Sequence, residues 1–345
     1  MRYQEKETPF YLFGLGGRDK YIYTEGKLYH YPETEPVLTW QVQQEEILPA
    51  DYTVRLTTEK GTVLIYDNEE GLYLRDTDGA ERCLSRGHVT LPTFDGYTYR
   101  EQLRVLHGEL CVNVIGGKPV PNFLVYQKPW YRDGAMMALA FEKTGNLALI
   151  SDWAASLTEM YDRNNAGNEE PDNLGQLLCL LALTGNRSHP LISKAVDEAK
   201  RRITDGVLTG ITDGAEHPVY QTKWLKFGLD LLGLDSSFVR IPDVPDSYGV
   251  LFWMDGHREP MEQPAYCENY PYLTIAACHT GNLPVPEREL PTTYPMTSET
   301  WASEAKYEKQ LPYFPALAAM HSSAPHTWHA AELFLYLLEF RDTVK

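Results

Sequence analysis

The feature that most constrains this chain is a series of apolar helical segments that each stop at a glycine. The glycines are Gly145, Gly185, Gly233 and Gly281, and three of the four stops read Thr-Gly-Asn. Successive stops are 40, 48 and 48 residues apart. Glycine readily takes the left-handed conformation that ends a helix, and a near-constant interval of this size is typical of repeated helical hairpins. The chain after residue 97 is therefore predicted to be an array of paired helices.

Two kinds of helical segment alternate in this region. Residues 172–184 are apolar on almost every side, as in a helix surrounded by protein, whereas residues 188–205 carry an apolar stripe opposite charged residues. The apolar kind comprises residues 99–107, 133–144, 172–184, 220–232, 270–280 and 327–339. Six inner helices wrapped by outer ones predict a mainly α fold, an (α/α)6-type toroid. Prolines within 241–246 and 283–295 interrupt the outer layer, so an open solenoid is the alternative.

The first 95 residues have a β pattern instead. Apolar and polar residues alternate, and short turns that end in glycine, such as 24–26, 59–61 and 69–71, separate the runs. The segment Gly14–Gly17 lacks the third glycine of a nucleotide-binding loop and no helical pattern follows it, so we expect a tight turn there. We predict an antiparallel β domain over residues 1–95, packed against a helical, catalytic domain over 96–345.

Composition excludes several classes of partner. The 31 basic and 48 acidic residues give a net charge of −17, which argues against nucleic acid and anionic membranes. Five irregularly spaced cysteines without a C-x-x-C pair favour a reducing compartment. The first ten residues contain acids where a signal peptide needs an apolar run, and no apolar run approaches transmembrane length. We therefore expect a cytoplasmic protein, without a cofactor.

The segments that precede the predicted inner helices share aromatic rings, carboxylates and amides. If these helices point their N-termini to one rim, the segments meet there. Aromatic faces stack on sugar rings, and carboxylates and amides bond hydroxyl groups, so this mixture predicts an oligosaccharide site. Few clustered lysines or arginines argue against a phosphorylated substrate. The predicted substrate-binding residues are Trp130, Tyr131, Arg132, Asp133, Asn168, Asp172, Asn173, His217, Tyr220, Trp224, Tyr270, His326 and Trp328.

Three of these segments resemble the six-hairpin glycosidases: WYRD at 130–133, NEEPDN at 168–173 and PHTWHAAELFLYL at 325–337. The resemblance covers about residues 97–342 in architecture, and it implies an (α/α)6 toroid, several of which carry an N-terminal β domain. In glucoamylase-like members the Arg-Asp of a W-x-R-D motif grips the terminal sugar, a role that falls here on Arg132 and Asp133. The similar positions for the general acid are Glu169 and Glu170.

No residue aligns with the second catalytic carboxylate of that family. From the residues alone, Glu268 and Glu304 are the candidates for the base, because each lies near a predicted inner helix. A solvated helix face is the plainer explanation of Glu304. His326 and His329 have the spacing of half a metal site, but no third ligand follows at a standard distance, so we predict no metal.

The acids also have structural explanations. Asp133 lies at a predicted N-cap, and residues 169–172 place acids at a helix start, where the dipole favours them. Because the dipole also lowers the pKa of a carboxyl group, Glu169, one residue farther from the helix, suits a general acid at least as well as Glu170.

Three function classes follow. The leading hypothesis is a glycoside hydrolase with two catalytic carboxylates. A polysaccharide lyase is the second, with His217 or Tyr220 as base and Arg132 as charge neutraliser. The third is a catalytically silent glycan-binding protein, because fold does not imply function. The sugar, the linkage, the stereochemical course and the oligomeric state are open at this stage.

Overall fold

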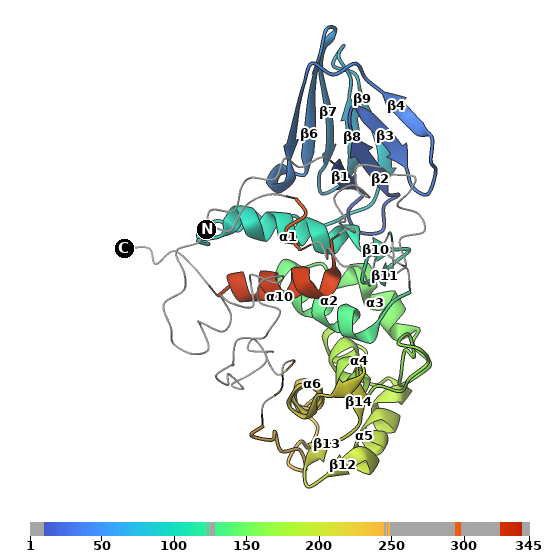
Figure 1. Cartoon of the computed structure of the whole chain (residues 1–345), viewed down its shortest axis with the longest axis vertical. Helices are drawn as coiled ribbons and strands as arrows, with labels where there is room; N and C mark the ends of the chain where they lie inside the picture. The colour runs from blue at the N-terminus through green and yellow to red at the C-terminus, as the bar shows by residue number, and fades with distance from the viewer. Residues whose placement is uncertain are drawn as a thin grey trace. The chain divides into compact units, whose positions relative to one another are not determined.

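The computed structural model describes residues 10–122, 124, 128–244, 246, 248, 294–297 and 325–339. Within them the chain forms seven α-helices and five antiparallel sheets (Figure 1). It divides into two compact units, each described by itself below. The first unit comprises Met1–Lys128, Lys143–Leu149 and Glu289–Lys345, and the second comprises Pro129–Glu142 and Ile150–Arg288.

Two antiparallel meanders form the start of the first unit. One sheet has the order β1-β2-β3-β4 and the other the order β5-β6-β7-β8-β9. In the first predicted hairpin, Thr24 pairs with Lys27, and Glu25 and Gly26 have φ values of 49° and 72°. Positive φ at both turn positions matches the twist of paired strands, so the predicted hairpin is confirmed. The strands are β1 Phe10–Phe13, β2 Tyr21–Thr24, β3 Lys27–His30, β4 Pro36–Thr39, β5 Gln44–Leu48, β6 Thr53–Thr58, β7 Gly61–Asp67, β8 Gly71–Arg75 and β9 Glu81–Arg86.

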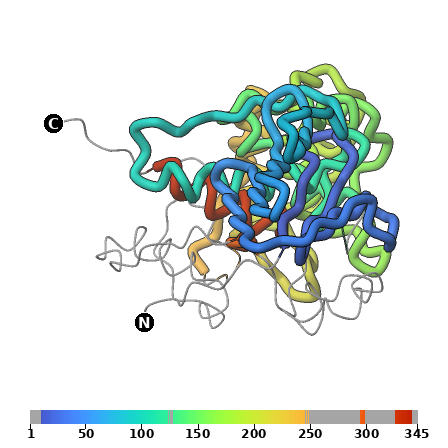
Figure 2. Tube along the Cα trace, turned by 90° about the horizontal axis from the view of Figure 1, so that it is seen from above, coloured from blue at the N-terminus to red at the C-terminus, as the bar shows by residue number. Residues whose placement is uncertain are grey.

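The apolar sides of both sheets share one core with helix α1 (Arg100–Val112). Val105 and Val112 of α1 belong to the same buried cluster as Phe10 and Val54 of the two sheets. On the first unit's helical side, α1 packs along α10 (Thr327–Leu337), which lies far away in the sequence (Figure 2). The strands thus bury apolar surface on a helix. The predicted boundary after residue 95 stays a prediction, because both sides of it lie in the first unit.

The glycine-rich segment Gly14–Gly17 is an internal turn between β1 and β2. The buried Lys20 ammonium donates to the carbonyl oxygen of Gly14 and, at 2.7 Å, to that of Gly16. Burial lowers the pKa of Lys20 to about 7. The backbone N–H of Gly14 donates to Asp67 Oδ2 at 2.9 Å. The carbonyl groups of this turn therefore hold a cation of the protein itself, which supports the tight turn over a phosphate loop.

Two helices of the second unit cross with their backbones in contact. They are α4 (Asp172–Leu183) and α6 (Pro218–Leu232), and α5 (Pro190–Arg202) packs beside α4. A Cβ atom on Gly228 would lie 2.7 Å from the carbonyl oxygen of Gly175, so neither residue has room for a side chain. The unit also holds most of α2 (Tyr131–Thr144) and α3 (Ala148–Ala155).

Glycine ends the helices as the sequence predicts. Gly145, Gly185 and Gly233 follow α2, α4 and α6 with φ values of 75°, 80° and 69°. These values lie in the left-handed region that favours glycine. The fourth predicted stop, Gly281, and the predicted helix at 270–280 lie outside the described residues.

The prediction of a mainly α, (α/α)6-type toroid is wrong. Only 35% of the described residues are helical, and the N-terminal region is rich in strands. Three two-stranded ribbons add to them: β10 Val114–Ile115 with β11 Lys118–Pro119, β12 Ile203–Thr204 with β13 Val207–Leu208, and β14 Ile211–Thr212 with β15 Ala215–Glu216.

The overlooked signal is the dipeptide Asp-Gly directly after a threonine, at Thr204 and at Thr212. Asp205-Gly206 and Asp213-Gly214 have positive φ at both positions, the geometry of a two-residue hairpin turn. The amphipathic pattern predicts a helix through Asp205, whereas α5 ends at Arg202. Ribbons therefore occupy stretches that a toroid would use for helices and their short loops, and the fold is mixed α and β.

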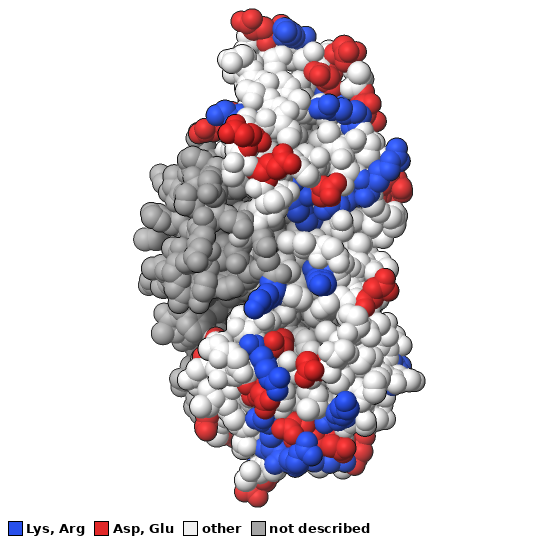
Figure 3. Space-filling view, turned by 90° about the vertical axis from the view of Figure 1, so that its right-hand side faces the viewer, with Lys and Arg blue, Asp and Glu red and all other residues white. Residues whose placement is uncertain are grey.

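The charged side chains do not separate by sign. On the face shown in Figure 3, lysine and arginine are interspersed with aspartate and glutamate over the described residues. None of the described helices is long and apolar enough to cross a membrane.

Candidate functional site

Three segments of the second unit converge on the side chain of Arg132. They are the first turn of α2, the residues that lead into α4, and the tip of the β14–β15 ribbon. Arg132 Nη2 lies 3.3 Å from Glu170 Oε2, Nε lies 3.6 Å from Asp172 Oδ2, and Nη1 lies 3.7 Å from Asp213 Oδ2. We call these four residues the Arg132 cluster. One cation thus lies among three carboxylates, two from the segment that leads into α4 and one from a ribbon tip.

The cluster is buried on one side and open on the other. Arg132 is 4% exposed, Glu170 is 2% exposed and Asp172 is fully buried, whereas the Asp213 side chain is 40% exposed. The partly exposed Trp130 ring lies 6.0 Å from the guanidinium carbon of Arg132. A ligand that reaches the cluster would therefore meet Asp213 and Trp130 first.

Neighbouring donors hold the two buried carboxylates. Glu170 Oε1 accepts from Asn165 Nδ2 at 2.9 Å and from the backbone N–H of Asp213. Asp172 accepts from Gln176 Nε2 at 2.8 Å and from Thr212 Oγ1 at 3.1 Å.

Burial shifts the pKa values in this cluster. It raises the pKa of Asp172 to about 6, although the nearby Arg132 works in the opposite direction. Burial lowers the pKa of Arg132, but Tyr220 and the three carboxylates raise it more, so this guanidinium stays charged. The carboxyl group of Asp172 therefore exchanges a proton at mildly acidic pH.

Helix α2 begins earlier than the sequence predicts. Its first residue is Tyr131, so Asp133 lies within the first turn and the prediction that it is the N-cap is wrong. The N–H of Tyr131 instead donates to Asp162 Oδ2 at 2.7 Å. This carboxylate comes from the segment before α4 and ties it to the start of α2. Burial raises the pKa of Asp162, against its hydrogen bonds from Asn164 and Tyr131.

A histidine and an aspartate form a dyad at the start of α6. His217 Nδ1 lies 2.9 Å from Asp246 Oδ1, and the N–H groups of Val219 and Tyr220 donate to Asp246 Oδ2 at 2.9 and 3.0 Å. Burial raises the pKa of Asp246, but these hydrogen bonds outweigh it and the net pKa is lowered. With its Nδ1 proton directed at the carboxylate, the imidazole presents Nε2 as an acceptor.

The dyad connects to the Arg132 cluster through an aromatic residue. The Tyr248 ring stacks on His217 with centroids 3.9 Å apart and planes 6° apart, and its hydroxyl donates to Asp213 Oδ2 at 2.7 Å. His217 is among the residues predicted from the sequence, whereas Asp213, Asp246 and Tyr248 are not. Asp213 had a usable signal, because the dipeptide Asp-Gly predicts a hairpin tip. Asp246 and Tyr248 had none, since they follow α6 in sequence and meet its beginning in space.

Several predicted residues have structural contacts instead. The Tyr131 hydroxyl donates to the carbonyl oxygen of Glu159 at 2.7 Å, and Trp224 is fully buried on α6. Asn173 Nδ2 donates to Gln176 Oε1 at 3.2 Å beneath the cluster. These residues position the helices and lie behind the site.

Other predicted residues lie at the surface. Asn168 is exposed, and Glu169 pairs with Arg163 at 2.5 Å and with Arg202 at 3.3 Å. These two ion pairs hold Glu169 between arginines, while Glu170 is the carboxylate that contacts Arg132. Sequence reasoning could not choose between the two because they are adjacent.

The remaining candidates lie either outside the described residues or in the first unit. Glu268, Tyr270 and Glu304 lie outside the described residues. His326 and Trp328 belong to the first unit, where Trp328 stacks on His329 with centroids 5.4 Å apart. Among the residues that the structure describes, no group of three His, Cys, Asp or Glu could hold a metal ion.

The second unit thus joins a buried guanidinium, three carboxylates, an oriented imidazole and two partly exposed aromatic rings. Such a mixture can bond hydroxyl groups, stack on a ring and move protons. No protein-family model, curated protein or solved structure matches this chain.

Proposed function

We propose that this chain is a glycoside hydrolase and that the Arg132 cluster binds its oligosaccharide substrate. One observation supports this above the others: carboxylates from two other segments hold a buried guanidinium beside a partly exposed indole. A fixed array of charged donors and acceptors next to an aromatic face suits a ligand with many hydroxyl groups and an apolar ring face. The proposal rests on this site alone and not on a toroidal fold.

The carboxylates of the cluster suit different tasks. Glu170 receives Arg132, Asn165 and the N–H of Asp213, a setting for a carboxylate that acts in its charged form, as base or nucleophile. Asp172 has its pKa raised to about 6 by burial and therefore carries a proton more readily. Two carboxyl groups in unlike environments are what this chemistry requires. Because Thr212 covers Asp172, a substrate must displace that hydroxyl before proton transfer from Asp172.

The general acid can be identified from how its replacement changes the turnover of substrates with poor and with good leaving groups. The variants are Glu169→Gln, Glu170→Gln and Asp172→Asn, and each is assayed on oligosaccharides and on aryl glycosides with activated leaving groups. Loss of the acid lowers turnover of oligosaccharides sharply and of activated glycosides much less, because these need little protonation. Equal losses on both substrate types exclude a residue from the role. If the wild-type chain binds glycans through Trp130 and Arg132 but cleaves none, it is a glycan-binding protein and the hydrolase proposal fails.

The His217–Asp246 dyad favours a second candidate, a polysaccharide lyase. An imidazole with Nδ1 bonded to a carboxylate is oriented to accept a proton at Nε2. A lyase removes the proton next to a uronate carboxyl group and expels the neighbouring glycosidic oxygen, which leaves a carbon–carbon double bond. Cleavage of a polyuronate with new ultraviolet absorbance that is lost in His217→Gln indicates a lyase. Release of reducing ends without that absorbance indicates a hydrolase.

A further inference from the structure

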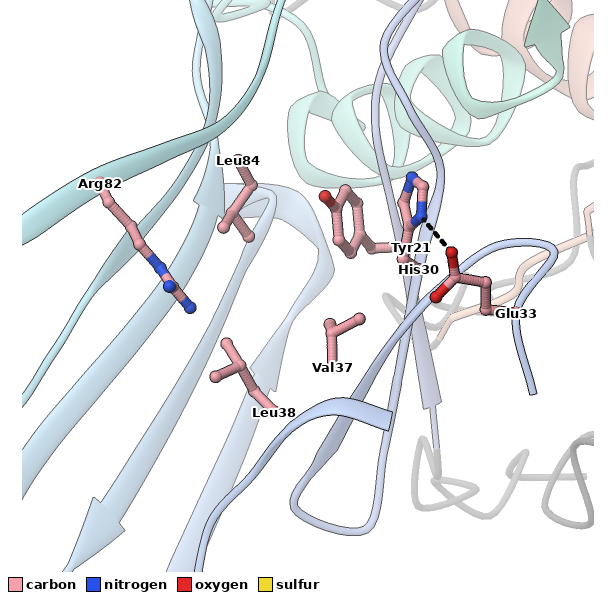
Figure 4. Close-up of a pocket in the computed structure, with 7 residues that line it drawn as sticks. All are labelled: Tyr21, His30, Glu33, Val37, Leu38, Arg82 and Leu84. Carbon is pink, nitrogen blue, oxygen red and sulfur yellow. Dashed lines mark ion pairs between the residues drawn. The ribbon is translucent and has the colours of Figure 1, made fainter. Parts of the chain in front are cut away.

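An open groove of about 320 Å³ lies on the β sheets of the first unit (Figure 4). Strands β2, β3, β4 and β9 and the residues after β3 line it. Its volume is at the small end of the range for ligand sites, enough for one or two sugar rings. The described residues of this groove are separate from the Arg132 cluster, which belongs to the second unit.

The middle of the groove is apolar and aromatic. Val37 is 46% exposed, and Leu38 and Leu84 are partly exposed beside it. The half-buried ring of Tyr21 lies against the ring of His30, with centroids 4.8 Å apart. In Figure 4 these side chains lie between the two charged ends of the groove. A ligand that covers apolar surface of this kind removes it from water, which favours binding.

The two ends differ in charge. Arg82 lies at one end, and at the other His30 Nδ1 is 3.6 Å from Glu33 Oε1 (Figure 4). Arg55 and Arg75 of the same five-stranded sheet pair with Glu46 at 2.8 Å and Glu81 at 2.9 Å. Arg82 makes no such ion pair with any residue that the structure describes. Its guanidinium is therefore available to an anion from outside.

We propose that this groove binds an acidic sugar unit of a glycan. The sugar carboxylate pairs with Arg82, because the planar guanidinium fork matches a carboxylate. The apolar face of the ring lies on Tyr21 and the aliphatic side chains between the two ends. A hydroxyl group both donates and accepts, which matches the imidazole and carboxylate of His30 and Glu33. The inference rests on the proposed function in that it gives a glycan-cleaving chain a second contact with an acidic glycan.

The test measures binding of digalacturonic acid and of its methyl ester by calorimetry. The ester keeps the rings and loses the charges, so it should bind at least tenfold more weakly than the acid. Arg82→Gln should lower the affinity for the acid at least tenfold and bring it to that of the ester. Arg86→Gln is the matched control, because Arg86 is exposed on the same strand but outside the groove, and it should bind like wild type. Tyr21→Leu should weaken binding of acid and ester alike.

Equal affinity for acid and ester, or an Arg82→Gln variant that binds the acid normally, would overturn the proposal. An acidic dipeptide that displaces the sugar and binds more tightly through Arg82 would also overturn it, in favour of a peptide site. Failure of the proposed function gives a different result. If the chain cleaves no glycan but binds digalacturonic acid through Arg82, the proposed groove site is supported and the proposed hydrolase function fails.

Discussion

Gly175 of α4 and Trp224 of α6 meet backbone to backbone. A Cβ atom on Gly175 would lie 2.2 Å from the carbonyl carbon of Trp224. This crossing aligns the first turns of the two helices, so that Gln176 reaches both Asp172 at 2.8 Å and the Tyr220 hydroxyl at 3.3 Å. The close approach of α4 and α6 thus fixes the position of Gln176, which lies on the buried side of the Arg132 cluster.

Gly175→Ala should therefore destabilise the chain strongly. The new methyl group overlaps backbone atoms that cannot rotate away, and we expect a loss of about 3 kcal/mol in the free energy of unfolding. Gly17→Ala is the control, because nothing lies within 4 Å of the atom added there. Urea denaturation of both variants tests this. An unfolding midpoint of Gly175→Ala equal to that of Gly17→Ala contradicts the crossing.

Arg132→Met should be as damaging, for an electrostatic reason. It leaves Glu170 and Asp172 buried without their cation, which costs about 3–5 kcal/mol. Arg163→Met removes an exposed arginine that pairs with Glu169, and it should leave the unfolding midpoint unchanged. The triple variant Arg132→Met, Glu170→Gln, Asp172→Asn should recover part of the loss. If Arg132→Met unfolds at the wild-type urea concentration, the buried ion pairs described above are not present.

Glu109 should make the stability of the chain depend on pH. Burial raises its pKa to about 7, against hydrogen bonds from Thr297 Oγ1, at 2.5 Å, and from the N–H of Met296. A glutamate in the unfolded chain has a pKa of about 4.3. The folded state therefore binds the Glu109 proton more tightly, so the contribution of Glu109 to the free energy of unfolding is full below pH ~4 and is lost as the pH rises to ~7. Burial lowers the pKa of His107, on the same helix, to about 3, and this group contributes with the opposite sign.

Glu109→Gln should remove this decline, which is on the order of 3 kcal/mol. Glu101→Gln, at the exposed start of the same helix, should keep it. In both variants the raised pKa of Asp172 still causes a smaller decline in the free energy of unfolding, which ends near pH ~6. Chemical denaturation at several pH values measures these slopes, and identical slopes in the two variants would exclude Glu109 as the cause.

Asp246→Ala should loosen the start of α6. It removes the acceptor of the Val219 and Tyr220 N–H groups, and loss of a capping side chain costs about 1–2 kcal/mol. Asp246→Asn keeps an acceptor and should lose less. Amide hydrogen exchange at these two residues should speed up in Asp246→Ala, while Asp235→Ala, an exposed site after α6, leaves it unchanged. Unchanged protection in both variants argues against the cap.

Asp133→Asn separates a role in the helix from a role in catalysis. Asp133 lies in the first turn of α2 and is 3% exposed. Because the residue is buried, loss of its charge near the helix start costs up to about 2 kcal/mol of stability. If the proposed function holds, loss of a charge-assisted bond lowers kcat/KM about ten- to a hundredfold. Glu142→Gln, exposed near the other end of the helix, is the control. Normal turnover by Asp133→Asn removes this residue from the site.

Local signals in the sequence predicted much of the fold. The helix ends at Gly145, Gly185 and Gly233 and the hairpin turn at 24–26 depend on backbone preferences of one or two residues, and all are confirmed. The β character of the N-terminal region has the same origin. The toroid failed because it extrapolated a repeat across stretches where Asp-Gly turns make ribbons.

Contacts between distant residues could be predicted only in outline. The sequence placed Arg132, Glu170 and Asp172 at helix starts that would meet, and the structure brings these three together. It could not assign Trp224 to the core, because burial of an indole depends on which side of α6 faces α4. Asp246 is recognised by no motif, since its role follows from the path of the chain after the helix.

The path of the chain after α6 makes the contact between His217 and Asp246 sensitive to a cut in the backbone. Helix α6 has 15 residues, a length of about 22 Å, yet Asp246 bonds to its first turn. The chain after Leu232 must therefore travel back along the whole helix. The contact between His217 and Asp246, which are 29 positions apart in the sequence, closes a ring without a covalent bond. A single protease cut at the exposed residue Asp235 would open that ring. The dyad would then depend on the affinity of two separate ends, and the nicked protein would lose its oriented imidazole before it lost its helices.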